Sequence, residues 1–339
     1  MKGVRLAVGI VVAIVLLYLT VRNMQFQSAV EIFLRVDVVY LFVAVVLLAF
    51  AYTVRIYRWT VMLKALDGTV TWRRAAGPFM ASFALNNVLP FRIGDLMRCF
   101  GFQNVLAIKP PRVLGSLLVE RILDLVTLLS FFAITLWRFQ PELEQSPYLN
   151  RSALVLTLIL IPLVVAILAP GIPAYIVLVV RRLPVLAHIR LVRKVSSFAL
   201  RAIWSFKVIG TSGRMVLLLL LSVVGWLLEG SVYFAVVVAL HGSARWTGPF
   251  FAMVSGTLAT LIPSTPGYVG TFDLFAKLGL TTFGETATRA AVEALTIHAV
   301  LWLPVTLAGL AYIAYTWGIV PALRLIAERK TTRTNVEIV

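Results

Sequence analysis

The residues best suited to binding chemistry form a polar segment inside an apolar part of the chain. This segment contains Asn86, Asn87, Pro90, Arg92, Gly94, Asp95 and Arg98. Pro90 cannot continue a helix and Gly94 permits a tight turn, so polar side chains and free backbone amides should gather here. Two arginines beside the first amides of a returning helix suit a phosphate group. The alternative is that Arg92 and Arg98 only extend to a membrane interface and mark its orientation.

A second charged group lies within the apolar stretch 113–137. Glu120 and Asp124 are four residues apart and share one helical face, with Arg121 beside them. An ionisable side chain costs about 2.5–3.5 kcal/mol to insert into a bilayer, so all three should face the protein interior. They provide either a counter-charge or proton site for a substrate, or an internal pair with Arg121 or the first segment's arginines. Two carboxylates are also candidate metal ligands, but no further ligand supports them, and we expect no metal.

Two further polar features lie later in the chain. Glu229 is near the centre of the apolar stretch 215–240, where it suits a proton relay or substrate contact, or a satisfied hydrogen bond. A second turn segment contains Pro263, Ser264, Thr265, Pro266, Gly267 and Gly270. A turn requires these prolines and glycines whether or not a ligand binds. His188, His241 and His298 have no metal-ligand spacing, so we expect hydrogen-bonded structural roles for them.

The composition places these residues in a membrane. Of the 339 residues, 60% are hydrophobic and only 13% are charged, which is too little polar surface to cover the apolar mass in water. Long apolar stretches without strict alternation favour spanning helices over a β-barrel. The single cysteine, Cys99, excludes an internal disulfide and a cysteine-rich metal cluster. Nucleotide, dinucleotide and metalloprotease motifs are absent, so we expect neither a cofactor nor an enzyme.

Length decides which apolar stretches can cross a bilayer core of about 30 Å. The stretches long enough to span are 4–21, 38–59, 113–137, 152–179, 215–240 and 288–318. Two others, 77–90 and 248–262, are too short, and each is followed by turn residues and a second apolar stretch. We therefore expect about six transmembrane helices plus two re-entrant hairpins, at 77–107 and 248–283. Residues 24–36 and 190–205 have the one-sided apolar pattern of helices that lie on a membrane surface.

Charge predicts the orientation of this topology. The net charge is +17, from 31 lysines and arginines against 14 acidic residues. Most basic residues fall on one side, including a cluster that starts at Arg55 and Arg58, so the positive-inside rule predicts both termini in the cytoplasm. The hairpins then enter from opposite sides and form a degenerate inverted repeat, an arrangement in which substrate binds where broken helices meet. This charge indicates contact with anionic lipid headgroups and not with nucleic acid.

We treat residues 1–339 as one integral membrane domain. Its first half, about 1–150, contains the first hairpin, and its second half, about 151–320, contains the second. Residues 321–339 form a basic tail that should lie in the cytoplasm.

Three ordered motifs give the chain a family resemblance. NNVLPFRIGDLMR, LLVERILDLV and LIPSTPGYVGTFDLF resemble the lysylphosphatidylglycerol synthase transmembrane-region family, the flippase-like part of the multiple peptide resistance factor. The chain departs from the family pattern at Asp95, where Glu is more frequent, and at Tyr268, where a second Gly is common. The soluble aminoacyltransferase domain of two-part members is absent, so the resemblance does not imply lysine transfer. Stand-alone members are implied to move lipids, including phospholipids, polyprenyl-linked sugars or hopanoids.

These observations favour a multi-pass protein of the inner membrane that moves an amphiphilic lipid between leaflets. The headgroup should be an anionic phosphate, held by Arg92 and Arg98, while the acyl chains stay in the bilayer. One alternative is a membrane-embedded glycosyl- or phosphotransferase that uses Glu120 and Asp124. Another is a partner of a glycosyltransferase or of lipid biosynthesis that transports nothing itself.

Overall fold

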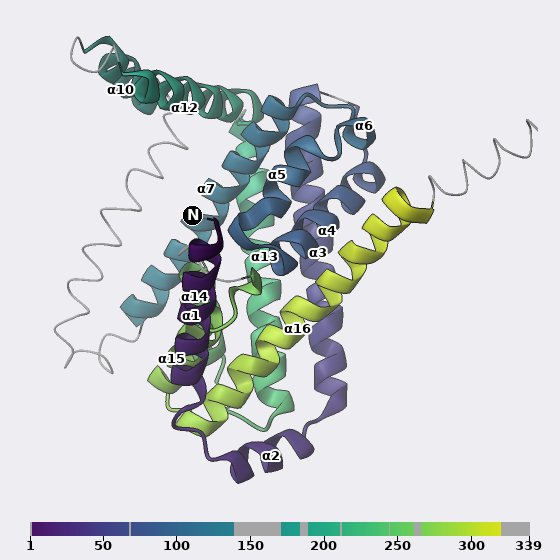
Figure 1. The fold of residues 1–339 in the computed structure, drawn as a ribbon, viewed down its shortest axis with the longest axis vertical. Helices are drawn as coiled ribbons and strands as arrows, with labels where there is room; N and C mark the ends of the chain where they lie inside the picture. The colour runs from purple at the N-terminus through teal and green to yellow at the C-terminus, as the bar shows by residue number, and fades with distance from the viewer. Residues whose placement is uncertain are drawn as a thin grey trace, which may run out of the picture.

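The computed structural model describes residues 2–67, 69–138, 171–183, 189–210, 212–243, 245–260 and 266–319. Over these ranges the chain forms helices and turns without a strand, which confirms the expected all-α membrane fold (Figure 1). Among the described residues, three helices are long and apolar enough to cross a membrane, namely α3 (Val38–Asp67), α13 (Ser212–Ala239) and α16 (Ala287–Ile313). They coincide with three of the expected spans.

The paired helices α3 and α13 form the centre of the bundle and contact each other along much of their length. Ala44 and Ala51 of α3 are fully buried, and small side chains such as these allow helix backbones to approach closely in a membrane. Helix α16 crosses this pair obliquely and packs on α4 (Figure 1). At their closest approach a Cβ on Gly309 would lie 2.4 Å from the Met80 carbonyl oxygen, so only glycine fits there.

The first expected hairpin is a helix–turn–helix. Helix α4 (Trp72–Val88) leads through the short helix η1 (Pro90–Arg92) into α5 (Ile93–Phe100), which packs back on α4, and α6 (Gln103–Leu106) follows. The turn falls at Leu89 because Pro90 lacks the amide that would continue α4.

The second expected hairpin has the same general form. Helix α14 (Thr247–Ala259) and helix α15 (Thr271–Thr282) pack against each other, and η2 (Pro266–Tyr268) lies in the turn between them. Of the predicted turn residues, Pro263, Ser264 and Thr265 lie outside the described residues. That the two hairpins enter a membrane from opposite sides stays a prediction.

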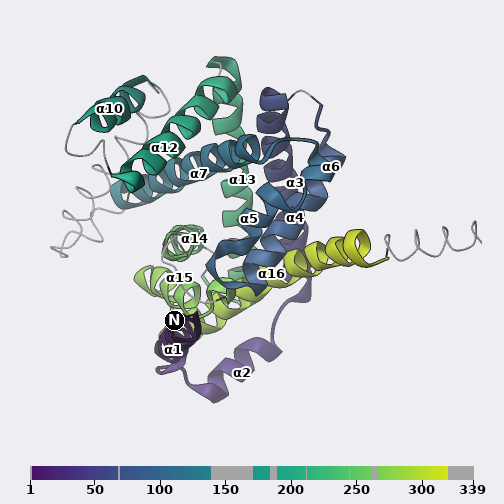
Figure 2. The ribbon, with the colours of Figure 1, turned by 45° about the horizontal axis from the view of Figure 1, so that its top comes forward.

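The remaining helices surround this centre. Helix α1 (Lys2–Val21) packs along α15, and α2 (Phe26–Leu34) lies across the lower end of the molecule in Figure 1. Helix α7 (Pro110–Arg138) coincides with another expected span. The expected basic surface helix is α12 (Arg190–Ile209), which packs on α7 and on α10 (Gly171–Arg182), as Figure 2 also shows. The α16 helix continues into η3 (Ala314–Ile319).

Three expected features fall wholly or partly outside the described residues. Most of the expected span 152–179, the residue His188 and the basic tail 321–339 belong to this group. The division into two halves is likewise untested and stays a prediction.

Candidate functional site

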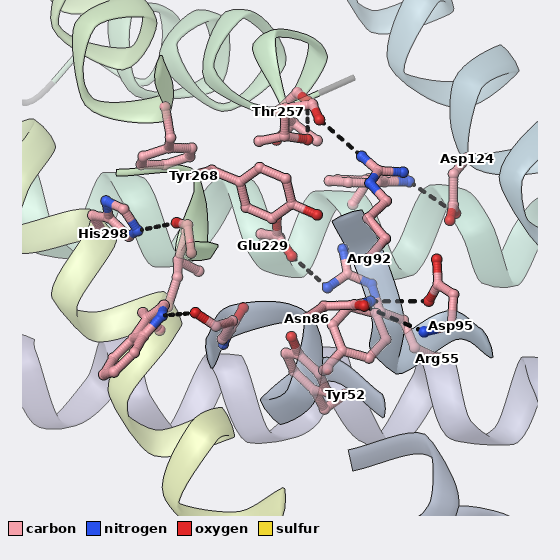
Figure 3. A pocket seen from close by; sticks show the side chains of 18 of the residues that line it. Tyr52, Arg55, Asn86, Arg92, Asp95, Asp124, Glu229, Thr257, Tyr268 and His298 are labelled. Atoms are coloured by element: carbon pink, nitrogen blue, oxygen red, sulfur yellow. Dashed lines mark hydrogen bonds and ion pairs between the residues drawn. The ribbon is translucent and has the colours of Figure 1, made fainter. Parts of the chain in front are cut away.

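A central cavity of about 180 Å³ lies where the turns of the two hairpins meet (Figure 3). Helices α3, α7, α13 and α16 supply the rest of its wall. The predicted site residues that line it are Asn86, Asn87, Arg92, Asp95, Glu120, Arg121, Asp124, Glu229 and Gly267. The fold therefore brings together residues from four of the predicted polar motifs, across more than half of the chain.

Arg92 is held at the junction of the two turns. Its backbone is left-handed, with φ 52°, and Tyr268 in the opposite turn is also left-handed, with φ 60°. The Arg92 guanidinium donates to the Thr260 carbonyl oxygen at 2.9 Å and lies 5.7 Å from the centre of the Tyr268 ring. In the part of the chain that the structure describes, no carboxylate lies within ion-pair distance of Arg92. Left-handed backbone in two bulky residues costs about 1–3 kcal/mol each and concentrates at functional sites.

Arg121 provides a second cation on the cavity wall. Its guanidinium lies 3.5 Å from Asp95 and 3.6 Å from Glu120, distances too long for strong hydrogen bonds, and its Nε has no partner among the described residues. A third of the Arg121 side chain is exposed. Asn86 orients Asp95, because the two side chains are joined at 2.9 Å and Asn86 also accepts the Asp95 amide at 3.2 Å.

Arg98 does not line the cavity. Its side chain is completely buried, donates to Glu120 at 2.9 Å and to Ser82 at 2.9 Å, and lies 4.3 Å from the Phe79 ring centre. A side chain with these contacts cannot extend to a membrane interface. The structure gives Arg98 the role of fixing α5 against α4 and α7, in place of the headgroup contact that the sequence predicted.

Three predicted turn residues do not line the cavity but shape the helices and turns that do. A Cβ on Gly94 would lie 1.9 Å from the Ser82 carbonyl oxygen, so glycine permits the close packing of α5 on α4. Gly270 has φ 83° and packs against the backbone of α1. Pro266 begins η2, the short helix that carries Gly267 and Tyr268 to the cavity.

Two arginines of α3 were missed as site residues. Arg55 and Arg58 were assigned to the cytoplasmic basic cluster, but both are buried and line the cavity, which corrects that assignment. Arg55 pairs with Glu229 (Figure 3), and Arg58 pairs with Asp124 at 2.6 Å. The apolar stretch ends near residue 59, but α3 continues to Asp67. Arg55 and Arg58 are therefore well before the end of the helix. The available signal was the need of Glu229 and Asp124 for buried cationic partners.

His298 of α16 connects the second turn to the cavity. One ring nitrogen lies 2.7 Å from Asp273 and the other 2.9 Å from the Gly267 carbonyl oxygen. Asp273 also accepts the amide of Gly270 at 2.8 Å at the start of α15. His298 thus has the hydrogen-bonded role that was expected, and in addition it lines the cavity.

A comparison with family models decides the affiliation of the chain. The model described as the lysylphosphatidylglycerol synthase TM region matches residues 6–309. The chain belongs to this family. The matched region of this lysylphosphatidylglycerol synthase TM-region protein includes both hairpins and every residue that lines the cavity. Family and apolar helices together make it a multi-pass membrane protein from a family linked to lipid metabolism or translocation. None of the curated proteins matches the chain.

Proposed function

We propose that this protein moves an amphiphilic lipid with an anionic phosphate headgroup between membrane leaflets, without enzymatic activity. The main support for this proposal is Arg92. This cation has no carboxylate partner in the described chain and is held at the point where both hairpin turns meet the cavity. The cavity of about 180 Å³ has room for a phosphate group and not for a whole lipid. The acyl chains would therefore stay in the bilayer.

The charges around the cavity support an anion as the ligand. Glu120, Asp124 and Glu229 are each paired with an arginine, and breaking a buried pair costs about 3–5 kcal/mol. A phosphate can engage Arg92 and the partly free donors of Arg121 without breaking any of these pairs. The same pairs leave neither Glu120 nor Asp124 free as a base or metal ligand, which favours transport over transfer chemistry.

The contact between the two turns provides a way to open and close the cavity. Arg92 and Tyr268 contact each other across the junction, so separation of the turns would open one side of the cavity and their return would close it. Exposure alternates between the leaflets in our proposal, with the protein in the inner membrane, both termini in the cytoplasm and the hairpins entering from opposite sides.

Proteoliposomes that contain a fluorescent anionic phospholipid test this function. Each charge-assisted contact contributes about 1.5–3 kcal/mol, so Arg92→Gln should reduce lipid movement by about tenfold or more. Arg92→Lys should recover only part of the rate, because lysine keeps the charge and loses the planar fork. The matched control is Arg245→Gln, an exposed arginine that does not line the cavity. Undiminished movement in Arg92→Gln would remove the phosphate site and favour a neutral lipid.

A further inference from the structure

Glu293 is a buried carboxyl that the proposed transport cycle does not yet use. It lies in the second turn of α16, its exposed fraction is 0%, and neither carboxylate oxygen has a hydrogen-bond partner among the described residues. One oxygen faces Gly242, where a Cβ would lie 2.1 Å away. Burying an ionised carboxylate without a partner is far more costly than burying a neutral carboxylic acid. This environment therefore favours the protonated form of Glu293.

The cation one helical turn before Glu293 is bonded to other groups. Arg289, one helical turn earlier, donates to the Leu240 carbonyl oxygen at 2.6 Å and lies 3.8 Å from Glu285. Glu285 in turn accepts the Ser243 amide at 2.6 Å. Glu293 and Arg289 are four residues apart on one helical face, so Arg289 can pair with an ionised Glu293 once it leaves Leu240.

No other charged group neutralises Glu293. The charged or titratable side chains on the first turns of α16 and on the segments beside it include Arg22, Glu31, Arg35, Asp37, His241, Arg245, Asp273, Lys277, Glu285, Arg289 and His298. None of them is bonded to either Glu293 oxygen. Several are already engaged, as Lys277 is with the Thr20 carbonyl oxygen and His298 with Asp273.

Two cavities are lined by residues of α16 that precede and follow Glu293, and Glu293 itself lines neither. A second cavity, of about 850 Å³, is lined by Glu31, Arg35, His241 and Arg289, and we call it the α2 cavity. Arg289, which lines the α2 cavity, lies one helical turn before Glu293. In the other direction His298 lines the central cavity and follows Glu293 by five residues, or about 7.5 Å along the helix.

We propose that Glu293 is a proton-binding site between the α2 cavity and the central cavity. A proton from water in the α2 cavity forms the carboxyl O–H bond, and the same bond breaks when the proton returns to water as Arg289 pairs with the carboxylate. The consequence rests on the proposed function: proton binding at Glu293 is coupled to lipid movement through His298 and the second turn.

Infrared spectroscopy of the purified protein tests the site without requiring transport. The wild type should show the carbonyl band of a protonated carboxylic acid that is lost in Glu293→Gln and shifted in Glu293→Asp. The second variant keeps the test valid if glutamine prevents folding. Asp37→Asn, which removes a carboxyl that lines neither cavity, should leave the band unchanged. A wild-type spectrum that lacks the band, or a band that survives in Glu293→Gln, would overturn the proposal.

Transport with a trapped pH-sensitive dye tests the coupling. Proton movement should accompany lipid movement in the wild type and in Asp37→Asn, and should be lost in Glu293→Gln. Lipid movement without proton movement in the wild type would overturn the coupling and leave lipid translocation intact. An assigned band in a protein that moves no lipid would support the proton site and contradict the proposed function, so the two failures are distinguishable.

Discussion

At the scale of single residues, the interior of this bundle is organised by arginine–carboxylate pairs. Arg98 with Glu120, Arg58 with Asp124 and Arg55 with Glu229 join α3, α5, α7 and α13. Separating the partners of any pair would leave a charge buried without compensation, so the pairs oppose movement of these helices away from each other. The pairs also fix the cavity wall, and Arg92 belongs to none of them.

The Arg98–Glu120 pair predicts a stability effect. Glu120→Gln should lower the free energy of unfolding by about 3–5 kcal/mol, because it leaves the completely buried Arg98 without its counter-charge. Replacing both partners, as Glu120→Gln with Arg98→Met, should recover part of that loss. Thermal unfolding in detergent measures both effects, with the exposed Glu31→Gln as control. An unchanged unfolding temperature in Glu120→Gln would contradict the structural role given to this pair.

The sequence was enough to find the acidic members of these pairs and not their partners. Glu120, Asp124 and Glu229 stand out because each interrupts an apolar stretch. Arg55 and Arg58 do not, since they lie at the end of such a stretch and look like interface residues. Only the packing of α3 against α13 and α7 shows that both arginines point inward. The residue spacing within one helix does not reveal which other helices pack on it.

At the scale of elements, the two hairpins are matched by their turns. Each turn places a left-handed residue with a large side chain at the central cavity, Arg92 in η1 and Tyr268 in η2. Apolar length and the proline–glycine signals were enough to predict both helix–turn–helix elements. The contact between the turns was predicted only from the analogy of inverted repeats, because it joins residues distant in sequence.

Gly267 predicts how closely the second turn must approach the first. It has φ 66°, and a Cβ there would lie 2.8 Å from Trp302 Nε1 and 3.1 Å from the Asn87 carbonyl oxygen. Gly267→Ala should therefore displace the turn and reduce lipid movement, beyond the backbone strain of about 1–2 kcal/mol. Gly284→Ala is the matched control, because Gly284 also has a positive φ of 98° and nothing within 4 Å of its Cβ position. If both variants transport lipid at the same rate, crowding at Gly267 would be excluded as a cause of reduced transport.

At the scale of the whole molecule, the ends of the bundle differ in charge. The end that carries α6 and α12 in Figure 1 holds basic residues such as Lys64, Lys109 and Arg190, while α2 and the start of α16 form the opposite end. The sequence was enough to predict this polarity, since it depends only on which connections carry lysine and arginine. It could not predict the α2 cavity, which depends on how three separate segments pack.

The last prediction concerns orientation, on which the inverted repeat depends. Lys64 lies in the last turn of α3 and Lys109 precedes α7, and both are exposed on either side of the first hairpin. If that hairpin is re-entrant, cysteines at these two positions should react with an impermeant reagent from the cytoplasmic side only. The background variant Cys99→Ser removes the single native thiol, which is buried. Glu31→Cys on α2 provides the opposite control, because it should react only from the outer side.

The pattern of labelling separates the two possible topologies. A hairpin that returns to its own side keeps both positions on one face, whereas a segment that crossed the membrane would place them on opposite faces. Reaction of Lys64→Cys and Lys109→Cys from different sides would therefore convert the first hairpin into a span and invert every later element. The two turns would then no longer enter from opposite leaflets, and alternating exposure of the central cavity would lose its structural basis, although the anion site at Arg92 would remain.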